Sequence, residues 1–359
     1  MPAHVQAVHV QPRSMVPPSG QGAVRIHVPA AAADEESMGT VAFVFPGQGS
    51  QSVGMGEALA SAHPAAAETF AIADSALGEP ITALAFTGPG EDLDRTQNAQ
   101  PALLATSIAY LLALQGGLMA VGREPWKPAF LAGHSMGQYS AMVAAGVISL
   151  EDGVRLVRQR GLRMQSSGRD GAMAAIIGLD DDRLPELIEA GEAYGVFGVA
   201  NRNSPGQIVV SGERAAVEAA AEAAKGLGAK RAIVLPVSVA AHSPLMAEAA
   251  EGMRGVLADI AFSAPSAPLL ANADARPLTT GEACRAELVD HLTTGVDWVG
   301  AVEAMAAAGV TTFIEVGPGR VLTGLIKRIV PDLEAYALDD PAAPGRLTIP
   351  DIDAVPASA

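Results

Sequence analysis

The chain has 359 residues, about the length of two domains or of one large domain with a smaller one inserted. Its 23 Lys and Arg against 39 Asp and Glu give a formal net charge of −16, which excludes a general electrostatic attraction to nucleic acid or anionic lipid. Hydrophobic residues make up 49% but aromatic residues only 4%, so we expect a globular core of Ala, Val, Leu and Ile. The lone Cys284 excludes an internal disulfide.

Both ends of the chain differ from the middle. The first 38 residues carry five prolines, no apolar periodicity and no signal-peptide layout. We expect a disordered leader over 1–39, or a true start near Met38, and a loosely ordered tail over 340–359. The longest apolar segments, 101–114 and 141–147, are shorter than the ~20 residues of a membrane helix. The sequence therefore predicts a cytoplasmic protein with no membrane partner.

From Thr40 onward, strand and helix patterns alternate. Alternation of this kind predicts an α/β fold with a mostly parallel sheet covered by helices. The strands of this pattern are expected at 41–45, 129–132, 268–271 and 311–316, and its main helices at 101–115, 151–165, 245–259, 285–292, 298–308 and 321–329.

The middle of the chain has a different order of elements. Strands at 172–177, 196–200, 207–211 and 231–235, with helices at 181–190 and 214–225, give the β-α-β-β-α-β order of a ferredoxin-like unit. We therefore predict a discontinuous large domain over 40–168 and 236–339, with a small domain inserted over 169–235. The cleft between the two would be the natural ligand site.

The first chemical signal is the segment Gly133–Gly137, which fits G-x-S-x-G between a buried strand and a helix. A sharp strand-to-helix turn needs small neighbours and lifts the Ser135 hydroxyl clear of the backbone. The helix that follows aims free N–H groups, including that of Met136, at any oxyanion formed there. This context predicts that Ser135 is a nucleophile.

A nucleophilic serine needs a base, and His242 and His291 are the candidates. His242 follows a predicted strand and precedes a helix start, where catalytic groups of α/β sheets collect. The spacing is equally compatible with a structural histidine that caps the helix. The other histidines lie in the leader, at a helix end or beside the serine: His4, His9, His27, His63 and His134.

Two further features concern the substrate. The glycine-rich turn 46–51 lacks the lysine of a phosphate loop, so it predicts a backbone oxyanion donor rather than nucleotide binding. An arginine on helix 151–165 aimed into the cleft would hold a substrate carboxylate, and we expect the other three to be solvated. The four arginines are Arg155, Arg158, Arg160 and Arg163. No Cys/His cluster has zinc spacing, so no metal is expected.

Six motifs in this order resemble the bacterial malonyl-CoA:acyl carrier protein transacylase family of fatty acid synthesis, over about Thr40 to Asp339. The resemblance implies a hydrolase-like large α/β domain with a mostly parallel sheet and an inserted ferredoxin-like small domain. The motifs are the segments 43–51, 133–137, 159–161, 203–207, 237–242 and 315–319.

The resemblance also implies roles. Ser135 would be acylated, His242 would act as general base and acid, and the backbone N–H groups of Gln48 and Met136 would form the oxyanion hole. Arg160 would bind the malonyl carboxylate. The reaction would be ping-pong between malonyl-CoA and holo acyl carrier protein, with no cofactor, and we expect a monomer. The acidic carrier would dock on local positive charge, for which the candidates are Lys225, Lys230, Arg231, Lys327 and Arg328.

Two positions depart from the family pattern. Gln138 stands where the family often has Glu, and His291 stands where it commonly has a glutamine that orients the catalytic histidine. Three alternatives are open for His291: its backbone carbonyl orients His242, its side chain orients His242, or its side chain lines and narrows the acyl pocket.

Three other functions compete with this interpretation. A free-standing acyltransferase of a polyketide synthase would share the site and differ in its carrier. An α/β serine hydrolase would place Asp or Glu and then His after the serine, with the histidine near the C-terminus. A non-catalytic carrier-binding scaffold would not need serine, histidine and arginine together.

Overall fold

The computed structural model describes residues 40–167, 170–237 and 239–338. The predicted leader over 1–39 and the predicted tail over 340–359 lie outside these residues.

The first sheet is mostly parallel and has the strand order β11-β10-β1-β2-β7-β8, with only the β7–β8 pair antiparallel among the described residues. Side chains alternate along β1: Phe43 and Phe45 enter one core, whereas Ala42 and Val44 enter the core on the opposite face. Both faces are buried, as a parallel sheet requires. The strands are β1 (Thr40–Phe45), β2 (Phe130–Gly133), β7 (Leu269–Leu270), β8 (Pro277–Leu278), β10 (Val310–Val316) and β11 (Glu334–Leu338).

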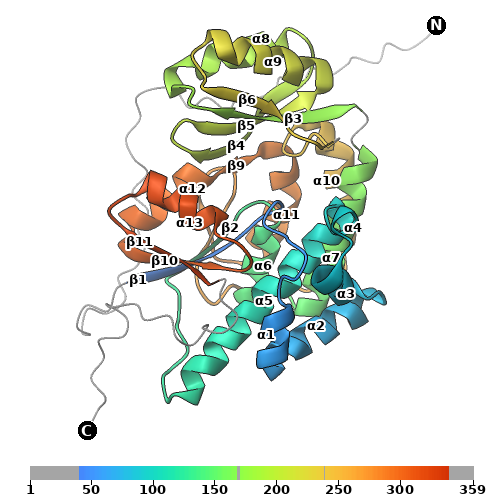
Figure 1. Cartoon of the computed structure of the whole chain (residues 1–359), viewed down its shortest axis with the longest axis vertical. Coiled ribbons are helices and arrows are strands. Elements are labelled where there is room, and N and C mark those ends of the chain that lie inside the picture. The colour runs from blue at the N-terminus through green and yellow to red at the C-terminus, as the bar shows by residue number, and fades with distance from the viewer. Residues whose placement is uncertain (1–39, 168–169, 238, 339–359) are drawn as a thin grey trace, which may run out of the picture. The chain divides into compact units, whose positions relative to one another are not determined.

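Helices cover the two faces of this sheet unequally (Figure 1). The larger core includes residues of α5, α6, α7, α10 and α11, and the smaller core includes residues of α12 and α13. The bounds are α1 (Glu57–Ala62), α2 (Pro64–Leu77), α3 (Ile81–Thr87), α4 (Gly90–Leu93), α5 (Thr96–Ala120), α6 (Gly137–Ala144), α7 (Leu150–Ser167), α10 (Ala247–Ala258), α11 (Gly281–Thr294), α12 (Trp298–Ala307) and α13 (Val321–Ile329), with the short 3-10 helix η2 (Pro244–Met246).

The second sheet has the order β6-β3-β5-β4-β9. Its first four strands are antiparallel neighbours, and α8 and α9 pack against one face (Figure 1). The chain order β3-α8-β4-β5-α9-β6 is the ferredoxin-like one. The elements are β3 (Gly171–Ile177), η1 (Asp181–Arg183), α8 (Leu184–Glu192), β4 (Phe197–Ser204), β5 (Gln207–Glu213), α9 (Arg214–Gly226), β6 (Arg231–Val234) and β9 (Val296–Asp297).

The mostly parallel α/β class predicted from sequence is confirmed, whereas the domain boundaries stay a prediction. The short strand β9 comes from the later part of the chain and pairs in parallel with β4, so the second sheet is completed by residues outside 169–235. The sequence analysis does not predict strands β8, β9 and β11. Each is a short segment with little pattern of its own, and pairing with β7, β4 or β10, respectively, makes it a strand.

The helix predicted at 101–115 is longer at both ends, because α5 runs from Thr96 to Ala120 and contains Pro101 in its interior. Proline is common at the first helical position, which placed the predicted start too late. The helix is long and apolar enough to cross a membrane, yet 72% of its apolar window is buried inside the protein, as in a core helix.

Candidate active site

Ser135 occupies a strained turn between β2 and α6. Its φ is 54°, in the left-handed region that non-glycine residues rarely adopt. The flanking glycines are required by close backbone approach. A Cβ on Gly133 would lie 2.0 Å from the carbonyl carbon of Gly137, and a Cβ on Gly137 would lie 2.2 Å from the Phe45 oxygen. The predicted strand–turn–helix geometry is thus present.

Ser135 and His242 form a hydrogen-bonded pair. The Ser135 Oγ lies 2.8 Å from His242 Nε2, and His242 Nδ1 lies 2.6 Å from the backbone carbonyl of His291. Because a carbonyl only accepts, Nδ1 carries the hydrogen and Nε2 is left to accept the Ser135 hydroxyl proton. This is the tautomer that a general base needs. His242 also has a positive φ, 63°.

The pKa of His242 is lowered to about 3, first by burial and second by the positive charge of Arg160. The imidazole is therefore neutral, and able to accept a proton, throughout the physiological range. For the same reason the imidazolium that forms when His242 accepts a proton is disfavoured, as long as no anion compensates the charge of Arg160.

Arg160 reaches the same hydroxyl from α7. Its guanidinium donates to Ser135 Oγ at 3.0 Å, and its side chain is essentially fully buried at 1% exposure. Among the described residues it has no acidic partner, and its Nε has no hydrogen-bond acceptor. The guanidinium lies 5.9 Å over the Tyr139 ring. Burial raises the pKa of Tyr139 to about 12, so its hydroxyl stays neutral.

The expectation that the other three arginines of this helix are solvated holds only in part for Arg163, which is half-buried, and is wrong for Arg158. Its side chain is buried and is held by Glu79 and Asn98, because α7 packs against α5 and α2 along that face. Arg155 is exposed and pairs with Asp152. Arg158 therefore helps to pack α7 against its neighbours, whereas Arg160 belongs to the site.

His291 acts through two different groups. Its backbone carbonyl accepts from His242, whereas its ring Nδ1 donates to the Glu287 carbonyl at 2.9 Å. Nε2 is then the acceptor, 3.3 Å from the Arg160 guanidinium. Burial and the charge of Arg160 hold the pKa of His291 well below its usual range. Of the three alternatives, the geometry matches orientation of His242 by the backbone.

The predicted oxyanion donors lie on the turn after β1 and on the elbow. A Cβ on Gly47 would lie 2.6 Å from the His134 oxygen, so the turn crosses directly against the elbow. Within the described residues, neither the N–H of Gln48 nor that of Met136 donates to a protein acceptor. The turn is tethered by its side chain, because Gln48 Nε2 donates to Thr96 Oγ1 at 3.2 Å.

Sequence reasoning missed Asn272, which follows β7. Its side-chain oxygen accepts from the Ser135 N–H at 2.9 Å, and its side-chain nitrogen donates to the Gly133 carbonyl at 3.0 Å. An Asn just beyond the carboxyl end of a sheet strand is the signal that could have found it. Gln138 supports the same turn, accepting from the Gly133 N–H and donating to the Leu270 carbonyl.

His134, beside the nucleophile, makes its side-chain hydrogen bond to the second sheet. Its Nε2 lies 2.9 Å from Asn203 Oδ1 on β4, so the second sheet touches the elbow. No cluster of three or more His, Cys, Asp or Glu suited to a metal ion occurs within 40–167, 170–237 and 239–338.

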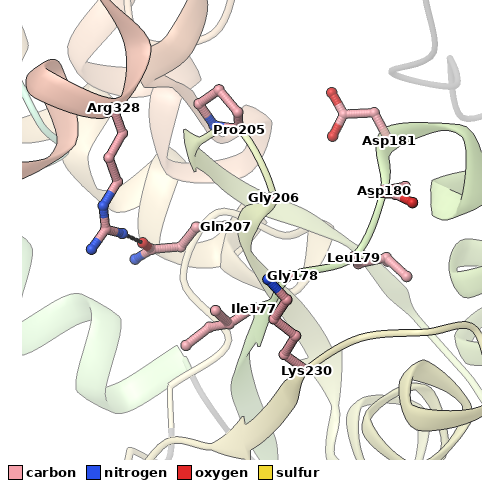
Figure 2. A pocket seen from close by; sticks show the side chains of 10 residues that line it. All are labelled: Ile177, Gly178, Leu179, Asp180, Asp181, Pro205, Gly206, Gln207, Lys230 and Arg328. Carbon is pink, nitrogen blue, oxygen red and sulfur yellow. Dashed lines mark hydrogen bonds between the residues drawn. The ribbon is translucent and has the colours of Figure 1, made fainter. Parts of the chain in front are cut away.

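A cavity of about 510 Å³ lies elsewhere, where α13 meets the second sheet (Figure 2). Arg328 and Lys230 line it, and the Arg328 guanidinium donates to Gln207 at 2.8 Å. Asp180 and Asp181 line its opposite side, and Asp181 is paired with Arg202 at 3.6 Å.

Comparison with known proteins places this geometry in a family. The family model described as "Acyl transferase domain" matches residues 42–339. The malonyl CoA-acyl carrier protein transacylase of Escherichia coli K12 is 50% identical over 305 residues, which cover 84% of this chain and 96% of that protein.

Two solved structures are similar at TM-score 0.79 and 44% identity. One is an acyl carrier protein S-malonyltransferase from Vibrio cholerae, with 84% of this chain and 97% of that chain covered. The other is a malonyl-transacylase in complex with its holo type II polyketide acyl-carrier protein, with 84% and 96% covered. With a match over 42–339 and half of its aligned residues identical to a curated member, this chain belongs to the acyl transferase domain family.

Proposed function

We propose that this protein transfers a malonyl group from malonyl-CoA to the phosphopantetheine thiol of acyl carrier protein, through a malonyl ester of Ser135. The observation that carries the proposal is the buried Arg160 guanidinium, 3.0 Å from the nucleophile and without an acidic partner among the described residues. An unpaired buried charge is costly, and a free carboxylate on the acyl group would compensate it. The transacylase relatives support the same substrate.

In the first half-reaction the Ser135 hydroxyl gives its proton to His242 Nε2 while its oxygen attacks the thioester carbonyl. The N–H groups of Gln48 and Met136 would stabilise the oxyanion. When this intermediate collapses, the C–S bond breaks, and the His242 imidazolium returns the proton to the departing CoA sulfur. Malonyl-Ser135 and free CoA are the products.

The second half-reaction reverses these roles. The carrier thiol gives its proton to His242 and attacks the ester carbonyl, and the Ser135 oxygen leaves with that proton. In both halves the malonyl carboxylate against Arg160 offsets the positive charge that otherwise disfavours the His242 imidazolium. An acidic acyl group is thus expected to assist the proton transfers of its own reaction.

We further propose that the carrier docks on the basic surface formed by Lys230, Arg231, Lys327 and Arg328, with Lys225 at its margin. The first four are exposed and have no ion pair among the described residues, whereas Lys225 pairs with Glu222 at 2.7 Å. Four available cations suit an acidic carrier on a chain whose net charge is −16. Lys230 and Arg328 approach this surface from different elements (Figure 2).

The carrier is proposed to be that of fatty acid synthesis, and the reaction to occur in the cytoplasm. A polyketide carrier is the second candidate, because a similar structure is a malonyl-transacylase bound to a type II polyketide carrier. Equal rates with both holo carriers would make the assignment to one pathway untenable.

The experiment that tests the function is intact-mass analysis after incubation with malonyl-CoA and then with holo acyl carrier protein. We expect one malonyl group on the wild type, followed by its transfer to the carrier. Ser135→Ala should gain no label, whereas Ser61→Ala, which changes an exposed serine of α1, should label normally. An adduct on Ser135→Ala would refute the nucleophile, and an adduct that vanishes in buffer alone would indicate a hydrolase.

A further inference from the structure

The Ser135 turn is held from both sides by one side-chain amide. Asn272 accepts from the Ser135 N–H at 2.9 Å and donates to the Gly133 carbonyl at 3.0 Å, so its two polar atoms bridge the strand end and the nucleophile. Ser135 needs such support, because its φ of 54° is not one that a serine adopts by preference. Asn272 is 137 residues away in sequence and is itself buried.

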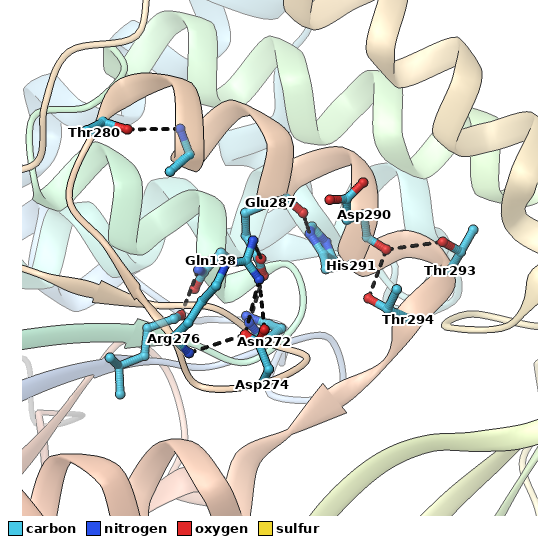
Figure 3. A network of polar contacts seen from close by, with 12 residues as sticks. Gln138, Asn272, Asp274, Arg276, Thr280, Glu287, Asp290, His291, Thr293 and Thr294 are labelled. Atoms are coloured by element: carbon cyan, nitrogen blue, oxygen red, sulfur yellow. Dashed lines mark hydrogen bonds and ion pairs between the residues drawn. The ribbon is translucent and has the colours of Figure 1, made fainter. Parts of the chain in front are cut away.

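Asn272 is in turn fixed by α11 and by β9. Its backbone N–H donates to Glu287 Oε1 at 2.7 Å, and its carbonyl accepts from Asp297 N–H at 2.6 Å. Glu287 is 1% exposed and its other oxygen lies 3.7 Å from the Arg276 guanidinium (Figure 3). The backbone of Asn272 is therefore anchored through both its N–H and its carbonyl, which fixes the point from which its side-chain amide reaches the turn.

The same helix also holds the base. One turn after Glu287, the His291 carbonyl accepts from His242 Nδ1 at 2.6 Å, and the Leu292 carbonyl accepts from the His242 N–H at 3.1 Å. Nucleophile and base come from segments 107 residues apart, and both are tied to neighbouring turns of α11.

We propose that Asn272 is a positioning residue for the transfer reaction, anchored by Glu287, and that α11 thereby sets the spacing between Ser135 and His242. The inference rests on the proposed function, since its consequence is the rate of Ser135 acylation. A misplacement of the nucleophile by about 1 Å costs on the order of 100-fold in rate. Binding of the acyl carboxylate before the reaction is assigned to Arg160 on α7. The affinity for malonyl-CoA should therefore not change when Asn272 is replaced.

The experiment measures single-turnover acylation by malonyl-CoA, together with the dissociation constant for malonyl-CoA and the unfolding midpoint. In Asn272→Ala, we expect acylation to slow by roughly 100-fold while the dissociation constant changes less than about threefold. Asp74→Ala is the matched control. Asp74 accepts from the N–H and hydroxyl of Thr82 between α2 and α3, so this change also removes two hydrogen bonds, far from the elbow in sequence.

Glu287 supplies the second pair of variants and keeps the test valid if Asn272→Ala does not fold. Glu287→Gln retains an oxygen that can accept from the Asn272 N–H, so acylation should stay within about threefold of wild type, whereas Glu287→Ala should lose most of it. The double variant with Asn272→Ala should be no slower than Asn272→Ala alone, because both changes release one restraint.

Two results would overturn the proposal. One is an acylation rate in Asn272→Ala no lower than that of Asp74→Ala at equal loss of stability. The other is equal loss in Glu287→Gln and Glu287→Ala. Failure of the proposed function looks different, because the wild type itself would then gain no malonyl group.

Discussion

At the scale of single residues, the site combines a neutral base with an uncompensated cation. His242 Nε2 and the Arg160 guanidinium both lie within 3.0 Å of the Ser135 hydroxyl oxygen. The serine lies on a local motif, so its place was predictable from neighbouring glycines. The reach of Arg160 was not predictable from helix periodicity, because Arg158 on the same helix is also buried and serves packing instead.

Replacing Arg160 tests acyl specificity. In Arg160→Ala, loss of a buried charge partner should weaken malonyl transfer by about 2–5 kcal/mol, roughly 30- to several-thousand-fold in kcat/KM. Acetyl transfer should fall far less, because acetyl has no carboxylate to pair. Transfer rates from malonyl-CoA and acetyl-CoA give the ratio. Arg155→Ala, on the exposed face of α7, is the control. Equal losses for both acyl groups would reduce Arg160 to a structural role.

The pH dependence of acylation reports on His242. Its folded pKa of about 3 lies below the ordinary 6.5, so the neutral, proton-accepting form persists as the pH falls. We expect kcat/KM for malonyl-CoA to stay within roughly twofold between pH 8 and pH 5.5. In Arg160→Ala the second cause of the depression is removed, so the acid limb should move to higher pH. An acid limb near 6.5 in the wild type would contradict this account.

At the scale of elements, the contact between β1 and α6 fixes the elbow. The backbone of α6 begins so close to β1 that a Cβ on Gly137 would meet the carbonyls of Phe45 and Pro46 at 2.2 and 2.9 Å. Both obstacles are main-chain atoms, which cannot rotate away. The order of elements around this contact could be predicted, because a strand, a glycine turn and a helix are all encoded locally.

A pair of glycine substitutions tests that contact. Gly137→Ala should destabilise the fold by about 1–3 kcal/mol or more, because β1 or α6 must shift. Gly116→Ala should instead stabilise it by up to about 1 kcal/mol, because Gly116 lies inside α5 with nothing within 4 Å of its would-be Cβ. Free energies of unfolding from urea titration check both. A neutral Gly137→Ala would mean that the two backbones are less tightly apposed.

The parts of the site that the sequence did not settle depend on distant contacts. Asn272 acts on Ser135 across 137 residues, and the carbonyl of His291, one of the three alternatives open from the sequence, acts on His242 across 49 residues. An Asn just beyond a strand end is a local signal but does not say which segment the amide binds, and a backbone carbonyl has no residue-type requirement at all. The same reason explains β9 and β11, which become strands only through their partners.

At the scale of the whole molecule, the net charge of −16 opposes an acidic carrier, so the proposed docking depends on local positive charge such as that of Lys230 and Arg328. The double variant Lys230→Glu with Arg328→Glu should slow malonyl transfer to the carrier by roughly five- to tenfold and flatten its salt dependence. Acylation of Ser135 by malonyl-CoA should be unchanged.

The control for that charge reversal is Arg254→Glu on α10, an exposed cation paired only with Glu251 among the described residues. It changes net charge in the same sense without altering the basic surface. Transfer rates are compared over a series of salt concentrations. If the double variant behaves like Arg254→Glu, the carrier docks elsewhere.

The acceptor for His242 Nδ1 is a main-chain oxygen, and this has an evolutionary consequence. Where a carboxylate orients the histidine, a single mutation can delete it; here no codon change at position 291 removes the acceptor. The side chain at that position is released from the duty of orienting the base and can drift. Here the side chain is a histidine whose Nε2 lies 3.3 Å from the Arg160 guanidinium, so a substitution at position 291 would change the surroundings of Arg160 while the acceptor of His242 Nδ1 stays in place.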